Sequence, residues 1–77
     1  MLRLFAGARE AAGTSRDEVP GGTVGDVLAS ARDRYGAAFT DLLDHCAIWC
    51  NGEPCELDLV VTESDEVAVL PPVSGGA

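Results

Sequence analysis

Segments in which apolar residues alternate with polar ones recur along the chain and predict β-strands. Five segments show this alternation or a short apolar run: residues 1–5, 16–19, 46–50, 55–57 and 66–70. The first and last are the most apolar, and Leu2 and Leu4 share one face of the first. Asn51-Gly52 follows the third segment and is the strongest dipeptide signal for a tight hairpin. We expect the first and last strands to be central, parallel neighbours, because the connection between them is long.

The best-defined helix is predicted for residues 24–35, where the apolar positions form a single stripe. The stripe consists of Val24, Val27, Leu28, Ala31 and Tyr35. Thr23 is the expected N-cap, and Asp26 follows three residues later as its capping-box partner. Shorter helical turns are predicted at residues 8–12 and 39–43. A helix with one apolar stripe buries one face, so we expect it to lie across one face of the sheet.

Together these elements predict an α+β fold, with a single mixed sheet and one main helix packed across one face. The chain of 77 residues is long enough for one domain only. We assign residues 1–70 to this domain and residues 71–77 to a flexible C-terminal tail. A domain of this size buries about 60% of the surface that its unfolded chain exposes, which leaves little room for an internal substrate cavity.

The formal net charge is −8, and all five basic residues are arginines. A strongly acidic surface repels phosphate backbones, so nucleic acid is excluded as a partner, whereas a basic protein would be attracted. The absence of lysine leaves no side-chain amine for a Schiff base or an isopeptide bond. No apolar run is long enough to span a membrane, and no signal-peptide pattern is present. We therefore expect a cytoplasmic protein without a membrane partner.

Residue types that often carry chemistry are present, but their spacing does not form a site. His45 is the single histidine, and no triad partner is identified by spacing. Cys46 and Cys50 would stand about 13 Å apart on one strand face, too far for a disulfide or a shared zinc ion. Cys50 and Cys55 flank the hairpin turn and could approach each other, but in a reducing cytosol we expect them free. We expect no bound metal or cofactor.

The end of the chain offers the remaining candidate chemistry. It consists of Pro71, Pro72, Val73, Ser74, Gly75, Gly76 and Ala77. The prolines end the last strand because they lack the N–H of a strand ladder, and the glycines make the backbone thin. Such an uncharged tail suits insertion into another protein's active site, although a frayed terminus is the common alternative. A terminal glycine carboxylate could be adenylated and then converted by sulfide to a thiocarboxylate, since no side chain crowds the attacked carbon.

Four stretches, which follow one another in order along nearly the whole chain, resemble the MoaD/ThiS family of ubiquitin-like sulfur carriers. They are residues 4–13, 23–28, 51–53 and 65–76. The ending Pro-Pro-Val-Ser-Gly-Gly is the most specific part, and it resembles the small subunit of molybdopterin synthase more than the thiamine carrier. The resemblance implies the β-grasp fold.

The resemblance also implies a reaction sequence. An E1-like adenylyltransferase of the MoeB/ThiF type would use ATP to adenylate the carboxylate of Gly76, and a sulfur donor would convert it to a thiocarboxylate. The tail would then enter the large subunit of molybdopterin synthase (MoaE type) and deliver sulfur to a pyranopterin precursor of the molybdenum cofactor. This chain would be a carrier and the non-catalytic small subunit, because the catalytic side chains belong to the partner.

One sheet face is expected to stay partly free, because the helix covers the other. Phe5 and Leu70 match family positions that contact the partner, and Trp49 is grouped with them as a candidate interface. The alternative is that these three side chains lie in the core.

Ala77 departs from the family pattern, which ends at the second glycine. We expect its removal, for which a metalloprotease is a candidate. The alternatives are that Ala77 is foreign to the natural chain, or that the protein serves a variant pathway. Two other functions share the tail chemistry: a carrier for cysteine, thiamine or another metabolite, and a ubiquitin-like modifier joined to lysines of other proteins.

Overall fold

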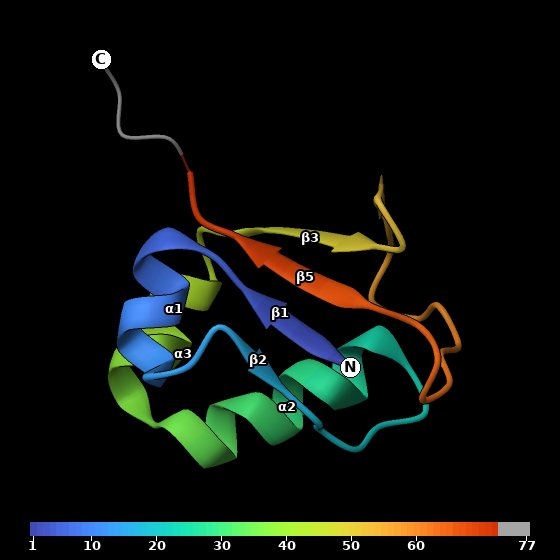
Figure 1. Cartoon of the computed structure of the whole chain (residues 1–77), viewed down its shortest axis with the longest axis horizontal. Helices are drawn as coiled ribbons and strands as arrows, with labels where there is room; N and C mark the ends of the chain where they lie inside the picture. The colour runs from blue at the N-terminus through green and yellow to red at the C-terminus, as the bar shows by residue number, and fades with distance from the viewer. Residues whose placement is uncertain (73–77) are drawn as a thin grey trace.

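The computed structural model describes residues 1–72, which form a five-stranded sheet with three helices on one face (Figure 1). The strands are β1 (Leu2–Leu4), β2 (Arg16–Asp17), β3 (Ala47–Cys50), β4 (Glu53–Pro54) and β5 (Val67–Leu70); the helices are α1 (Ala6–Ala12), α2 (Val24–Tyr35) and α3 (Ala37–Leu43). The sheet order is β2-β1-β5-β3-β4, with β1 and β5 parallel and the other pairs antiparallel. The predicted mixed sheet and its central parallel pair are confirmed.

The core lies between the sheet and the helices. Leu2 and Leu4 of β1 and Val67 and Val69 of β5 are buried on the helix-facing side. The predicted stripe of α2 supplies four further buried side chains: Val24, Val27, Leu28 and Ala31. Phe39 of α3 is the largest fully buried side chain, and α1 and α3 contact each other. The two short predicted helical turns, at residues 8–12 and 39–43, are thus helices α1 and α3, each beginning two residues earlier than predicted.

Two predicted strand segments are shifted in the structure. Cys46 lies outside β3, because its N–H donates to the carbonyl of Leu43 and completes the turn after α3. The prediction of a strand at residues 55–57 was largely wrong, because the strand that pairs with β3 after the turn is β4, which consists of Glu53–Pro54. In a hairpin with a two-residue loop, the residues directly before and after the loop pair with each other, and this pairing sets the register of the two strands. Only the Cys55 N–H continues the pairing, to the carbonyl of Ile48.

The predicted hairpin turn is confirmed by its backbone angles. Asn51 and Gly52 have φ values of 52° and 84°, and two positive values are what a type I′ turn requires. The Asn51 amide also donates to the Asp65 carboxylate and accepts from the Glu66 N–H. The hydrogen bond from Asn51 is the main reason why the pKa of Asp65 lies below its usual value. The hairpin is thus tied to the turn that leads into β5.

Helix α2 is anchored at both ends. At its start the Thr23 hydroxyl oxygen accepts the Asp26 N–H at 3.1 Å, as expected for an N-cap. At its end Arg34 and the Tyr35 hydroxyl both donate to the Asp17 carboxylate in β2. The hydrogen bond from Tyr35 is the main cause that lowers the pKa of Asp17, and the bond from Arg34 adds to it. Burial and the hydrogen bond to Asp17 raise the pKa of Tyr35 to about 12. Tyr35 therefore stays a protonated donor at neutral pH.

Tyr35→Phe is expected to lower the free energy of unfolding by about 1 kcal/mol at pH 7, because it removes a hydrogen bond to a charged acceptor. In the folded chain the pKa of Asp17 lies below its ordinary value of 3.8. The ionised carboxylate therefore contributes its full stabilisation of the fold above pH 3.8, and this contribution is lost as the pH falls through the folded pKa. The wild-type and variant stabilities should converge in acid. Urea unfolding at several pH values tests this, with Tyr35→Phe in an Asp17→Asn background as the control. An equal difference at pH 3 and pH 7 would contradict the assignment.

Candidate functional site: the open sheet face and the end of β5

Strand β5 leads directly to Pro71 and Pro72, the last described residues of the chain. It lies between β1 and β3 and is hydrogen-bonded along both edges. Pro71 is half-buried and Pro72 is exposed, and both follow the strand directly. In Figure 1, β5 ends on the side of the domain that carries α1, opposite the loop through which the chain enters β5. The predicted tail positions Val73, Ser74, Gly75 and Gly76, and Ala77, lie outside the described residues.

The three side chains of the candidate interface share the sheet face that the helices leave free. Leu70 pairs with Ala47, and Trp49 pairs with Ala68, so Leu70 and Trp49 point away from the buried Val69. Phe5 follows β1, whose Leu4 pairs with Val69, and its N–H donates to the Val69 carbonyl, so its side chain lies at the end of β5 on the face opposite to Leu4. Phe5 and Trp49 are 37% and 36% exposed, and Leu70 is half-buried. They are not core residues, so the alternative that they lie in the core is wrong.

Small and basic side chains that the sequence analysis did not select complete this open face. Ala47 and Ala68 lie between the large residues, and the alanine side chains leave the neighbouring aromatic and Leu side chains accessible. The Arg3 guanidinium lies over the Phe5 ring, 5.3 Å from its centroid, and forms a 3.7 Å ion pair with Glu66. Alternation alone places Arg3 on this face, but pairing across strands was needed to find Ala47 and Ala68. The face can bind an apolar partner surface and add one cationic contact.

The cysteines do not form a reactive set in the structure. All three are free thiols: Cys50 is buried, and Cys46 and Cys55 are half-buried. Burial raises the pKa of each thiol, so they are mainly protonated at neutral pH and are poor nucleophiles. His45 is exposed after α3. Within residues 1–72, no three His, Cys, Asp or Glu side chains are arranged to hold a metal ion.

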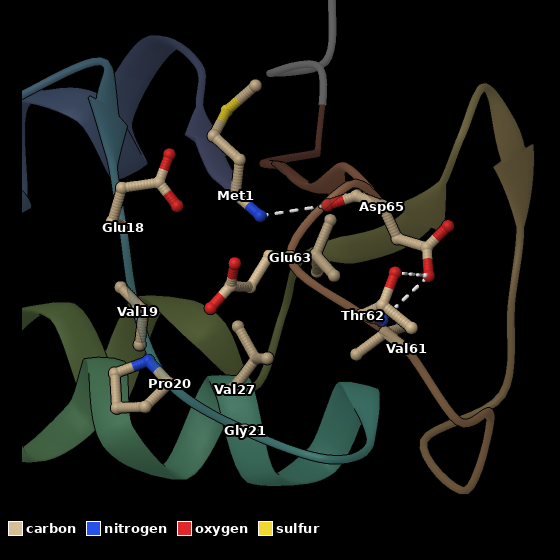
Figure 2. A pocket seen from close by; sticks show the side chains of 11 residues that line it. Met1, Glu18, Val19, Pro20, Gly21, Val27, Val61, Thr62, Glu63 and Asp65 are labelled. Atoms are coloured by element: carbon tan, nitrogen blue, oxygen red, sulfur yellow. Dashed lines mark hydrogen bonds between the residues drawn. The ribbon is translucent and has the colours of Figure 1, made fainter.

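A hollow lies on the side of the domain opposite the end of β5, between the β2–α2 connection and residues 61–65 (Figure 2). Glu18 and Glu63 point into it from its two walls, and Val61 and Val27 form its floor. Asp65 is turned to the side, where its carboxylate accepts hydrogen bonds from Thr62. Two exposed carboxylates without a buried donor do not form an acid–base pair, so the hollow is not a candidate active site. Among the described residues, no helix is long and apolar enough to cross a membrane.

Comparisons with known proteins give one consistent result. The ThiS family pattern matches residues 2–76. The small archaeal modifier protein 1 of Haloferax volcanii is 40% identical, over 96% of this chain and 97% of that protein. The molybdopterin synthase sulfur carrier subunit of Phaeosphaeria nodorum is 31% identical, over 97% of this chain and 88% of that protein.

A solved structure supports the same relationship. The solution structure of the small archaeal modifier protein 1 from Methanosarcina acetivorans aligns with a TM-score of 0.87 and 34% identity, covering 97% of this chain and 93% of that one. The sheet with its central parallel pair is thus the β-grasp, ubiquitin-like fold. Since fold and sequence agree along nearly the whole chain, this protein belongs to the ThiS/MoaD family of ubiquitin-like sulfur carriers.

Proposed function

We propose that this chain carries sulfur as a thiocarboxylate on Gly76 and donates it to a pyranopterin precursor during molybdenum cofactor synthesis. Its partners in this role are an E1-like adenylyltransferase and the large subunit of a molybdopterin synthase. The observation that carries the proposal is the match of residues 2–76 to the ThiS family, which includes both tail glycines. The similarity to a molybdopterin synthase sulfur carrier subunit supports the choice of acceptor.

The chemistry of the proposal needs a free carboxylate on Gly76. The sequence continues to Ala77, so the Gly76–Ala77 bond is hydrolysed first, and a metalloprotease is a suitable class of enzyme. The carboxylate then attacks the α-phosphorus of ATP, releases pyrophosphate and forms an acyl-adenylate. Sulfide, or a persulfide with a reductant, displaces AMP and leaves the thiocarboxylate. ATP is bound by the activating enzyme, and this chain supplies the electrophilic carbon.

The arrangement of β5 and the open face supports how the partners are engaged. The three apolar side chains Phe5, Trp49 and Leu70 form a contact surface beside the point where the tail leaves the sheet. When a partner covers this surface, Pro71 and Pro72 of this chain lie next to the partner. The residues that follow the prolines are then placed to enter the partner's active site. Because prolines restrict φ, these two positions limit the directions that the tail can take.

The proposal is tested by the intact mass of the chain after incubation with the activating enzyme, ATP and sulfide. We expect a chain that ends at Gly76 to exchange one oxygen for one sulfur, and the product to react with a thiocarboxylate-specific reagent. The controls are the same reaction without ATP and a chain that ends at Ser74. Sulfur gain by the full-length chain without loss of Ala77 would contradict the processing step, and sulfur gain by the shortened control would contradict Gly76 as the site.

The 40% identity to a small archaeal modifier protein favours one second candidate function, in which Gly76 is joined to lysines of other proteins. Because this chain has no lysine, it offers no side-chain amine as an acceptor, and conjugates should contain single copies rather than chains. Expression of a tagged form in cells, followed by denaturing gels and mass spectrometry of the branched peptides, separates the two functions. Conjugates that persist after thiol treatment support the modifier function, and their absence supports the carrier.

A further inference from the structure

Three large apolar side chains are exposed within four residues of the loop that precedes β5. Leu57, Leu59 and Val60 have exposed fractions of 54%, 42% and 74%. A single exposed apolar residue is ordinary on a protein surface, but a contiguous group of them generally marks a contact site. This group lies near the start of α2, on the side of the domain opposite the end of β5 (Figure 1).

The backbone of this loop is held in place, and the apolar side chains are not needed to hold it. The Gly25 N–H donates to the carbonyl of Leu57 at 2.8 Å, and the Val24 N–H donates to that of Leu59 at 3.0 Å. The Val61 N–H donates back to Gly22 at 3.0 Å. The bonds from Val24 and Gly25 satisfy N–H groups at the start of α2 that have no partner within the helix. Because the loop carbonyls serve this purpose, polar side chains at these positions would preserve the fold equally well.

Gly25 shows how closely the loop backbone approaches the helix. A Cβ at this position would lie 3.2 Å from the carbonyl oxygen of Leu57, which is tighter than nearly all real contacts. The close approach fixes the loop against α2. A contact surface that is already ordered loses little conformational entropy when it binds.

Carboxylates flank this apolar group in the sequence, and the half of the chain that carries them has no lysine or arginine side chain. Residues 36–77 contain eight Asp or Glu and neither Lys nor Arg, whereas residues 1–35 contain five of each sign. The two ion pairs within residues 1–72 involve Glu66 and Asp17, and leave Glu56, Asp58 and Glu63 unpaired. Glu63 also faces Glu18 across the hollow beside Val61 (Figure 2). The N-terminal ammonium of Met1 lines the same hollow and donates to the Asp65 carbonyl, so two carboxylates face one cationic group there.

We propose that Glu56, Leu57, Asp58, Leu59, Val60 and Glu63 form a second docking surface, the 56–63 surface, whose occupant is a protein segment with apolar and basic side chains. The apolar residues bury against the partner, and the lysines or arginines of the segment meet the carboxylates and the Glu18–Glu63 hollow. A second copy of this chain would bring like charges together, and anionic membranes and nucleic acids are repelled for the same reason. A cationic protein surface is the occupant that the charge distribution favours.

The 56–63 surface is placed so that it can bind one protein while the open sheet face binds another. The open face lies next to the end of β5, whereas the 56–63 surface lies on the other side of the domain (Figure 1). A protein bound there leaves Phe5, Trp49 and Leu70 free for another partner. Binding at the 56–63 surface does not depend on the acceptor of sulfur or on the chemistry of Gly76.

The test is a titration of the 15N-labelled full-length chain with a short amphipathic peptide of leucine and lysine, monitored by NMR. We expect amide shifts at residues 22–25 and 56–63, and at least about tenfold weaker binding to Leu57→Ser/Val60→Ser. The matched control, Trp49→Ser, should bind with unchanged affinity. Shifts confined to residues 47–49 and 68–70, or no binding at millimolar peptide, would overturn the proposal.

Charge is tested separately in the same experiment. Glu56→Gln/Asp58→Asn should weaken binding and reduce its dependence on salt, while the fold stays unchanged by circular dichroism. A peptide of leucine and glutamate with the same pattern should not bind. Equal binding of the two peptides, self-association through residues 56–63 in sedimentation experiments, or binding of anionic vesicles at this loop would each overturn the assignment of a basic protein segment.

Discussion

Phe39→Ala is expected to lower the free energy of unfolding by several kcal/mol. Phe39 is fully buried in α3, and its ring meets that of Tyr35 edge-on, with the centroids 5.1 Å apart. Truncation of a buried phenylalanine costs about 3–5 kcal/mol, because transfer energy is lost and a cavity remains. At about 0.05–0.15 kcal/mol per residue, a chain of this length has a total stability of roughly 4–12 kcal/mol. The loss therefore takes a large part of the total.

The chain provides a matched control for this prediction in its other phenylalanine. Phe5→Ala removes the same atoms from a side chain that is 37% exposed, and it should cost about 1 kcal/mol or less. Urea unfolding followed by circular dichroism measures both variants against the wild type. Similar destabilisation by the two substitutions would mean that α3 does not complete the core.

If the proposed complex with a large synthase subunit forms, Trp49→Ser/Leu70→Ser is expected to weaken it at least about 100-fold, since the proposal makes them two central interface residues worth about 2 kcal/mol each. The two positions lie on the open face beside Ala68 and Ala47. Their side chains point away from the core, so the variant should keep its fold. Calorimetric titration measures the affinity, and an NMR spectrum confirms the structure.

The control for this variant makes the same kind of change on the 56–63 surface. Leu57→Ser/Val60→Ser removes exposed apolar side chains, and it should leave binding to the large subunit within about threefold of the wild type, because effects at distant sites are independent. Equal losses from the two double variants would show that the partner covers both surfaces. Unchanged affinity of the open-face variant would remove the open face from the proposed interface.

Local patterns in the sequence were sufficient for most of the elements and for both ends of α2. The strand around Leu2 and Leu4, the stripe of α2 and the Asn51-Gly52 turn all depend on residues that are close in the chain. Periodicity reports such neighbours directly, because a side chain's face follows from its spacing along one element. The motif at residues 65–76 added the family and the candidate role of Gly76, which lies beyond the described residues.

Positions that depend on contacts between distant segments could not be read in this way. Alternation did not reveal that Trp49 pairs with Ala68, or that Leu70 pairs with Ala47, and the open face depends on both pairings. The β4 register was missed for the same reason, since the turn and not the apolar residues after it decides where pairing begins.

The loop before β5 shows the difference between composition and exposure. Residues 59–61 form an apolar run, yet Val61 is buried and Val60 is 74% exposed. The direction of each side chain depends on the backbone bonds that join this loop to Gly22, Val24 and Gly25, more than thirty residues earlier. Spacing along the chain thus predicted most strands and the main helix of this carrier. Backbone pairing between distant segments decided which apolar side chains enter the core and which lie on the open sheet face or the 56–63 surface.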